Sequence, residues 1–152
     1  MPGASRAWLE LAFCRQSLGD IEGAVGALRA LIAREPDNAS ALNFLGYLFA
    51  DRNRDLEEAE GLVRRALAQD PDNGAYVDSM GWVYYRLGRL EEARRELERA
   101  VELTGGDPVV LEHLGDVYKG LNLIELAREQ YRRSLERAGG NARVEAKLSE
   151  LR

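Results

Sequence analysis

Few side chains in this sequence could support catalysis or metal binding, since it holds one His and one Cys. His113 stands next to Glu112 and three residues before Asp116, where two carboxylates could orient an imidazole or hold a metal weakly. Metal sites normally supply more ligands than this. Neither a glycine-rich phosphate loop nor a nucleophile motif is present. We therefore expect no enzymatic activity, no metal and no cofactor.

The residues that surround His113 belong to a stretch that recurs along the chain. "LGYLFADRNRDLEEA" begins at Leu45, "MGWVYYRLGRLEEA" at Met80 and "LGDVYKGLNLIELA" at Leu114. Self-similarity at a period of about 20–50 residues is typical of repeat architectures. The small residues of the recurring stretch are spaced by 34, 35 and 34 residues: Ala12, Gly46, Gly81 and Gly115.

Each unit has the pattern of two amphipathic helices. In the third unit, Val77, Met80, Gly81 and Tyr84 follow the i, i+3, i+4, i+7 spacing of one helical face, and a second apolar stripe runs over 90–101. Gly81 therefore lies on the buried face, where a side chain would push the two helices apart. We expect it to permit their close approach, which offsets the conformational cost of a glycine in a helix.

The turns between the paired helices have their own signals. Gly88 can end a helix in the left-handed conformation, and Gly19 and Asn122 occupy the same place in other units. The second unit has "DRNRD" there, with one extra residue, so its turn should be longer. Asp20, Asp55 and Asn122 are candidate N-caps of the second helices.

These units resemble the tetratricopeptide repeat (TPR), a helical hairpin with large, small and proline residues at set positions. The resemblance implies an all-α fold, a right-handed superhelix of four hairpins followed by a short C-terminal capping helix. The units are residues 5–38, 39–73, 74–107 and 108–141, with 142–152 as the cap and 1–4 as an added remnant or a linker. The matching residues include Trp8, Leu11, Ala12, Ala24 and Pro36, then Leu42, Leu45, Gly46, Ala59 and Pro71, then Val77, Met80, Gly81, Ala93 and Ala100, then Leu111, Leu114, Gly115 and Ala127.

The resemblance also implies a function, which is the binding of a peptide or helix of a partner protein. In this family the first helices line a concave groove, and set positions on them face the ligand. The residues of this chain at those positions include Phe13, Asn43, Phe44, Tyr47, Asp78, Trp82, Tyr85, Arg86, Glu112, His113 and Asp116. Hairpin packing does not require the aromatic members, and large apolar groups in a groove point to a partner. Packing of Phe44 and Tyr47 between neighbouring hairpins is the alternative.

The charges along this groove restrict the partner. Asp78, Glu112 and Asp116 form an acidic end beside the aromatic residues, which suits a neutral or basic segment. The Lys, Arg and Asn of TPR domains that grip the C-terminal carboxylates of chaperones are missing at the corresponding positions. We expect no chaperone partner of that kind.

Composition agrees with a folded protein, with 45% hydrophobic and 31% charged residues. The net charge of −5 argues against nucleic acid as the main partner. The arginine pairs at 64/65, 94/95 and 132/133 fall on second helices, where we expect solvated charges. No apolar run approaches the roughly 20 residues that cross a bilayer.

The two ends of the repeat array differ. Val144, Leu148 and Leu151 form an apolar stripe that could cover the last hairpin, as a terminal cap must in a stacked array. The first hairpin has no such cap, so we expect a piece of a longer protein. A structural spacer, or a module that pairs through its first hairpin with a second copy, is the alternative function.

Two further expectations follow from the repeats. Cys14 matches Leu48, Val83 and Val117 of the other units, so it should be a small buried residue. A lone cysteine does not assign a compartment. The stretches quoted above are also similar to the last repeats of large bacterial TPR scaffold proteins of the cell envelope, which favours the periplasm over the cytoplasm without excluding the latter.

Overall fold

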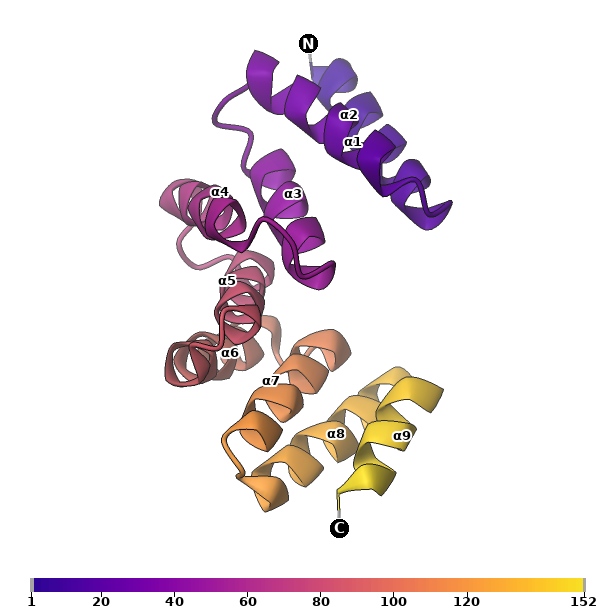
Figure 1. The fold of residues 1–152 in the computed structure, drawn as a ribbon, viewed down its shortest axis with the longest axis vertical. Coiled ribbons are helices and arrows are strands. Elements are labelled where there is room, and N and C mark those ends of the chain that lie inside the picture. The colour runs from indigo at the N-terminus through magenta and orange to yellow at the C-terminus, as the bar shows by residue number, and fades with distance from the viewer. Residues whose placement is uncertain (1, 152) are drawn as a thin grey trace. The chain divides into compact units, whose positions relative to one another are not determined.

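The computed structural model describes residues 2–151, without the side chain of Pro2, and this part of the chain is all-α (Figure 1). Its helices form successive hairpins and a last single helix, so the expected all-α architecture of paired helices is confirmed. The helices are α1 (Pro2–Ser17), α2 (Ile21–Arg34), α3 (Ala39–Asp51), α4 (Leu56–Gln69), α5 (Gly74–Arg86), α6 (Leu90–Thr104), α7 (Pro108–Gly120), α8 (Ile124–Ala138) and α9 (Ala142–Glu150).

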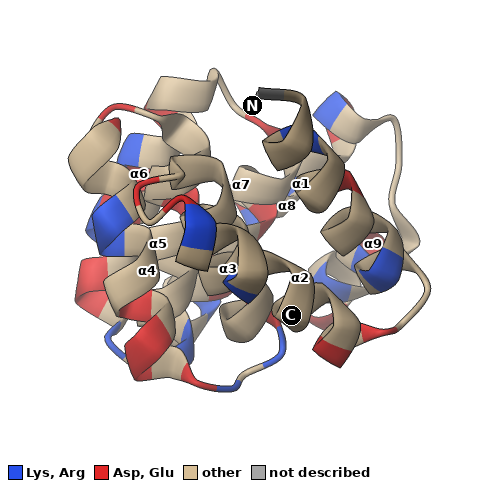
Figure 2. Cartoon of the chain, turned by 90° about the horizontal axis from the view of Figure 1, so that it is seen from above, with Lys and Arg blue, Asp and Glu red and all other residues tan. Residues whose placement is uncertain are grey.

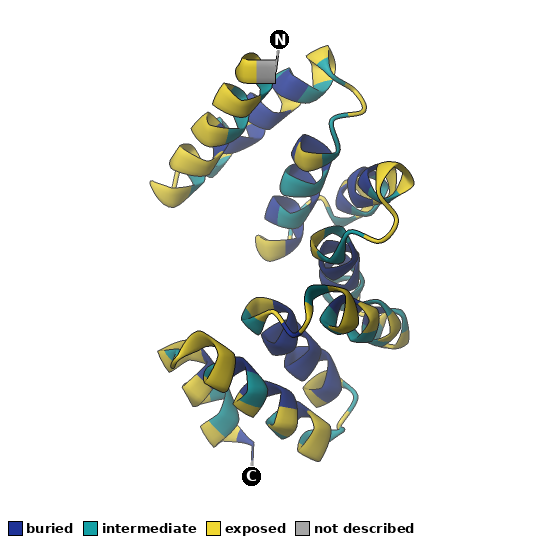
Figure 3. Cartoon of the chain, turned by 180° about the vertical axis from the view of Figure 1, so that it is seen from behind, coloured by how far each residue is buried: buried dark blue, intermediate teal, exposed yellow. Residues whose placement is uncertain are grey.

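The helices gather into two compact units, which meet in the chain between Pro71 and Asp72. Unit 1 contains α1 to α4, and α2 packs against α3 as well as against its own partner α1. Unit 2 contains α5 to α9, where α7 contacts both helices of the preceding hairpin and α9 contacts α8. In both units the buried residues lie on the facing sides of the helices, and α7 is buried along most of its length (Figure 3).

The regular spacing of small residues marks the closest approach within each hairpin. A Cβ atom on Gly81 of α5 would lie 2.5 Å from Cγ of Leu97 in α6. A Cβ on Gly46 of α3 would lie 2.6 Å from a methyl carbon of Val63 in α4. No real Cβ tolerates such distances, so the expectation of a packing role for these glycines is confirmed.

The turns follow the expected backbone geometry, but the caps do so only in part. Gly88 (φ +77°) and Asn122 (φ +61°) adopt the left-handed conformation, and Asp20 accepts a hydrogen bond from the backbone N–H of Gly23 at 2.9 Å. Asp55 and Asn122 make no N-cap hydrogen bond, contrary to expectation. Asp55 is itself left-handed (φ +50°), and the cap position of α8 falls on Leu123. The turn of the second hairpin is the longer one, as expected.

The C-terminal residues form α9, which begins at an effective N-cap. Asn141 accepts hydrogen bonds from the backbone N–H groups of Arg143 (2.9 Å) and Val144 (3.3 Å). Val144 and Leu151 are buried in unit 2. The helix therefore covers apolar surface, which is what a terminal cap requires.

Cys14 is exposed, so the expectation of a buried thiol is wrong. Its counterpart Leu48 is fully buried on α3, which packs against the second helix of the preceding hairpin. Within residues 2–151 no hairpin precedes α1, so the same position on α1 faces solvent. Burial at this position thus depends on a neighbouring repeat more than on the hairpin itself.

Candidate interaction surface on the first helices

The expected groove residues of unit 1 remain partly accessible on α1 and α3. Phe13 is 61% exposed, which is unusual for a phenylalanine. Asn43, Phe44 and Tyr47 are half-buried along α3. Phe44 and Tyr47 keep part of their rings accessible, whereas the side-chain oxygen of Asn43 is buried.

In unit 2, Trp82 is buried rather than presented to solvent. Only 6% of its surface is exposed, so the expectation of an accessible tryptophan is wrong. Its ring stacks on His113 of α7 with centroids 4.0 Å apart and on Tyr85 of α5 at 4.9 Å. The guanidinium of Arg86 lies 4.8 Å from the ring centroid. Tyr85 and Arg86 are half-buried and form the accessible edge of this aromatic cluster.

His113 is engaged by a neighbouring first helix. Its Nδ1 lies 2.8 Å from Oδ1 of Asp78 in α5, and both side chains are buried. Across residues 2–151 no group of three or more His, Cys, Asp and Glu is placed to hold a metal ion. The neighbouring carboxylates of α7 have other partners, so they do not converge on the imidazole.

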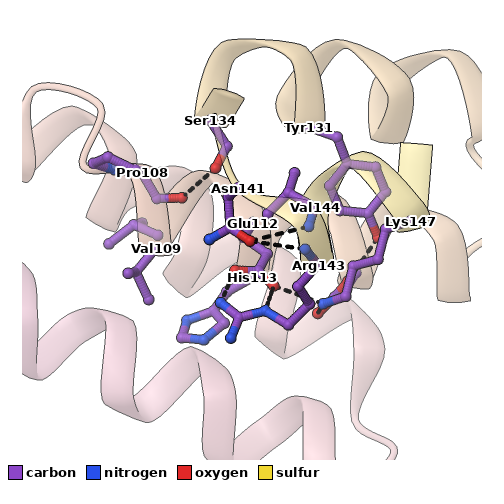
Figure 4. A network of polar contacts seen from close by, with 12 residues as sticks. Pro108, Val109, Glu112, His113, Tyr131, Ser134, Asn141, Arg143, Val144 and Lys147 are labelled. Carbon is purple, nitrogen blue, oxygen red and sulfur yellow. Dashed lines mark hydrogen bonds and ion pairs between the residues drawn. The ribbon is translucent and has the colours of Figure 1, made fainter. Parts of the chain in front are cut away.

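Glu112 is buried on α7 and bound by two basic residues of α9 (Figure 4). Arg143 donates from Nε and Nη2 to its two oxygens, each at 2.7 Å, and Lys147 donates from Nζ at 2.8 Å. Burial acts to raise the pKa of Glu112, but the hydrogen bonds from Arg143 and Lys147 outweigh it and hold the pKa below its ordinary value. The carboxyl group is therefore ionised and paired near neutral pH.

Asp116, one turn further along α7, completes this charged cluster. It accepts hydrogen bonds from Lys147 Nζ at 2.9 Å and from the hydroxyl of Tyr131 in α8 at 2.6 Å. Burial raises the pKa of Tyr131, and the hydrogen bond to Asp116 raises it further. Burial acts to lower the pKa of Lys147, but its bonds to Glu112 and Asp116 dominate and raise it.

The contacts between successive first helices repeat with the period of the sequence. Asp78 and Trp82 of α5 contact His113, which lies 35 and 31 residues later. Glu112 and Asp116 of α7 contact Lys147 at the same two separations. Lys147 stands 34 residues after His113, so α9 occupies the register of a further first helix.

Sequence reasoning missed Arg143 and Lys147 as partners of the acidic residues. The expectation of a cap rests only on the apolar stripe of the tail, whereas the repeat period already places Lys147 in the position of His113. The period was thus the signal that could have found them. It identifies corresponding positions, although it does not tell whether the side chains at those positions meet.

The second helices present mixed charges, as expected. Arg64 pairs with Glu60 on α4, and Arg94 pairs with Glu98 on α6, each one helical turn apart. Basic and acidic residues are interspersed in both units (Figure 2). Such pairs are solvated and contribute little individually. No helix within residues 2–151 has the length and apolar character needed to traverse a bilayer.

A cavity of about 220 Å³ opens in unit 1 between the start of α1 and the end of α2. Ser5 donates a hydrogen bond at 2.5 Å to Glu35, which also accepts one from Asn38. The described residues that line the cavity include no histidine and no cysteine. The lining residues are Ala4, Ser5, Trp8, Leu31, Arg34 and Glu35.

Comparisons with known proteins agree with this architecture. Three family models, each described as tetratricopeptide repeat, match residues 15–74, 52–112 and 110–141. No curated protein matches the sequence. The structure of TTC0263, a TPR protein of Thermus thermophilus, is similar with a TM-score of 0.83 and 23% identity, over 97% of this chain and 80% of that one.

Two other solved structures are similar at somewhat higher identity. PilF of Pseudomonas aeruginosa has a TM-score of 0.83 and 27% identity, over 99% of this chain and 68% of that chain. An O-GlcNAc transferase of Thermobaculum terrenum has a TM-score of 0.81 and 25% identity, over 90% of this chain but only 26% of that chain. A similar fold thus forms most of one TPR protein and a smaller part of a transferase.

Proposed function

The chain belongs to the tetratricopeptide repeat family, and from this premise we propose that it binds a peptide or helix of another protein through its first helices. TPR proteins are generally protein-interaction modules, and we propose that this chain acts by binding alone, without catalysis. The residues expected to line the groove are the candidate contacts.

The accessible aromatic residues of the first helices carry this proposal. Phe13, Phe44, Tyr47 and Tyr85 each keep part of a large side chain open on α1, α3 or α5. Aromatic residues are among those most enriched in binding hot spots, because they bury a large area at a small entropic cost. In unit 2, the stacking of Trp82 on Tyr85 restrains the tyrosine ring.

Self-association is a second candidate function, favoured by the apolar surface of α1. Leu11, Phe13 and Leu18 are exposed large hydrophobic residues on or directly after this helix. In this second function, the apolar surface of α1 pairs with a second copy of the chain, or the chain acts as a structural spacer. Light scattering over a range of concentrations separates the two functions, because only self-association increases the mass of the purified chain.

Affinity capture with matched variants tests the binding function. The double variant Tyr85→Ala and Phe44→Ala removes two accessible rings from first helices, and Leu126→Ala removes an exposed apolar side chain from the second helix α8. We expect the double variant to lose the proteins that wild type and the α8 variant retain from a bacterial lysate, as measured by quantitative mass spectrometry. Equal recovery by all three, with unchanged circular dichroism, would exclude both rings as contacts of a partner.

A further inference from the structure

We propose that the partner of unit 2 is a helix with two basic side chains one turn apart. In the free protein, α9 occupies the site at which this partner helix binds. This inference rests on the proposed function and names the chemistry of the ligand. The surface in question is the acidic seat, which we define as Glu112 and Asp116 of α7 together with the adjoining Tyr85 of α5.

The acidic seat requires cations. Glu112 and Asp116 are both buried, and their bonds to Arg143 and Lys147 cross from α7 to α9 (Figure 4). Departure of α9 would deprive both carboxylates of the cations to which they are bonded. Another molecule that supplies two positive charges at the same positions would therefore favour the state in which α9 has left.

The hold of α9 on unit 2 is otherwise modest. The helix spans only Ala142–Glu150, and isolated helices shorter than about 12–15 residues are marginal in water. Its buried apolar contacts come from Val144 and, just after the helix, Leu151. Gly139 and Gly140, both with positive φ, join it to α8. Such a link lets α9 leave as a unit, with loss of the hydrogen bond from Arg128 of α8 to the carbonyl oxygen of Leu151.

The repeat register indicates what can replace α9. Lys147 contacts Glu112 and Asp116 as His113 contacts Asp78 and Trp82, so the seat accepts a helix in first-helix register. The residues of α9 that the acidic seat recognises lie within the stretch "RVEAK" at 143–147. They are two bases at i and i+4, and an apolar residue directly after the first base. A partner helix with the same pattern would make the same contacts.

Charge favours a partner protein over a second copy of this chain. The net charge is −5, so two copies repel each other, whereas a basic helix is attracted. A second copy also brings an α9 whose bases are already paired. The proposal therefore commits to a basic helix of another protein as the occupant.

A peptide supplied in trans tests the proposal on the 152-residue chain. The probe is a fluorescent peptide of residues 141–152, and the variant Arg143→Ala with Lys147→Ala removes the competing internal bases. We expect this variant to bind the peptide at least tenfold more tightly than wild type in fluorescence anisotropy. A peptide with both bases replaced by alanine should bind neither protein. The matched control, Arg95→Ala with Arg132→Ala, loses the same charge from exposed second-helix positions and should behave as wild type.

Hydrogen exchange on wild type gives a second readout if the double variant fails to fold. Excess peptide should accelerate amide exchange in α9 and leave α3 unchanged. Three results would overturn the proposal. The double variant folds but does not bind the peptide, or the alanine peptide binds with the same affinity as the basic one, or the peptide leaves amide exchange in α9 unchanged. So would dimers of wild type that exchange α9 between copies.

These outcomes remain distinct from a failure of the proposed function. If the peptide does not bind but lysate capture still depends on Tyr85 and Phe44, only the basic-helix inference is wrong. If capture is also independent of these residues, the proposed function fails with it.

Discussion

Trp82 is held between its neighbours because its stacking partners come from both its own helix and the next first helix. His113 covers one part of the indole and Tyr85 another, so the ring lies in a layer between α5 and α7. The indole Nε1 is buried and makes no hydrogen bond within the described residues. The residue therefore contributes through the area and stacking of its ring and not through its polar group.

Substitution of Trp82 should separate these contributions. We expect Trp82→Ala to lower the free energy of unfolding by about 3–5 kcal/mol, the typical cost of removing a large buried aromatic ring. Trp82→Phe should cost much less, because it keeps a stacked ring and removes a buried donor that has no acceptor. Urea unfolding followed by circular dichroism measures both. Equal losses would mean that the indole itself is required.

Gly81 offers the sharpest steric test at the residue scale. Gly81→Leu should destabilise the protein by about 1–3 kcal/mol, because its side chain would overlap Leu97. Gly26→Leu is the matched control, since Gly26 is exposed in α2 and a Cβ atom there would meet no neighbouring atom within 4 Å. At that position the better helix propensity of leucine should leave stability equal or higher. Unchanged melting of the Gly81 variant would disprove the close-packing argument.

Glu112 should make the stability of unit 2 dependent on acid pH. Its pKa lies below the ordinary value, because hydrogen bonds from Arg143 and Lys147 outweigh the effect of burial. The folded state therefore binds the proton less tightly than the unfolded chain does. The stabilisation is complete above the ordinary pKa of about 4.3 and is lost as the pH falls through the lower folded value.

The variant Glu112→Gln measures this dependence. At pH 7 it should unfold at lower urea concentration than wild type, and the difference should shrink as the pH falls below about 4. Glu136→Gln, at an exposed position of α8, serves as the control and should follow wild type at each pH. A difference that stays constant with pH would show that the ionised carboxylate contributes nothing.

At the scale of elements, α9 combines two tasks. Val144 and Leu151 cover apolar surface of unit 2, while Arg143 and Lys147 neutralise the buried carboxylates of α7. A hairpin of the array receives both kinds of contact from the repeat that follows it. A short terminal helix can replace such a repeat because it keeps the same register.

Deletion of 142–152 tests this element. We expect the remaining chain to keep most of its helicity, to unfold at lower temperature and to associate through the uncovered surface of unit 2. Circular dichroism measures the helicity and melting temperature of the truncated chain, and light scattering measures its mass. A truncated chain that stays monomeric and equally stable would show that α9 is not a cap.

At the scale of the whole molecule, contacts within each hairpin and between neighbouring hairpins dominate. Such arrays respond to a local change mainly in the altered repeat and its neighbours. The division into two compact units, at Pro71 and Asp72, is in keeping with this local pattern of contacts. Stability is therefore distributed along the chain and not concentrated in one central core.

Paired variants should reveal this distribution. Gly46→Leu should accelerate amide hydrogen exchange chiefly in α3 and α4 of unit 1, and Gly81→Leu chiefly in α5 and α6 of unit 2, because each overlaps only its own hairpin partner. Mass spectrometry of exchanged peptides measures both variants with wild type as reference. Uniform acceleration across the chain would indicate a single cooperative unit.

The sequence by itself determined the repeats, the paired helices and the packing glycines. These features depend on local periodicity, on turn residues and on the exclusion of side chains at contact positions. Each of these signals can be read from residues that lie close together in the sequence. Even the left-handed turn at Asn122 follows from its place after the first helix. The same local signals misplaced the caps at Asp55 and Asn122, because one residue cannot be left-handed and also take the extended conformation typical of an N-cap.

Only the tertiary structure decided which groove positions are accessible. Asp78, Trp82 and Glu112 occupy positions that face a ligand in the family pattern, yet each is buried by a residue about one repeat away. Cys14 shows the converse, since its position is buried elsewhere and exposed on α1. Exposure at these positions depends on contacts between helices that are distant in sequence, and the periodicity of a single helix contains no information about them.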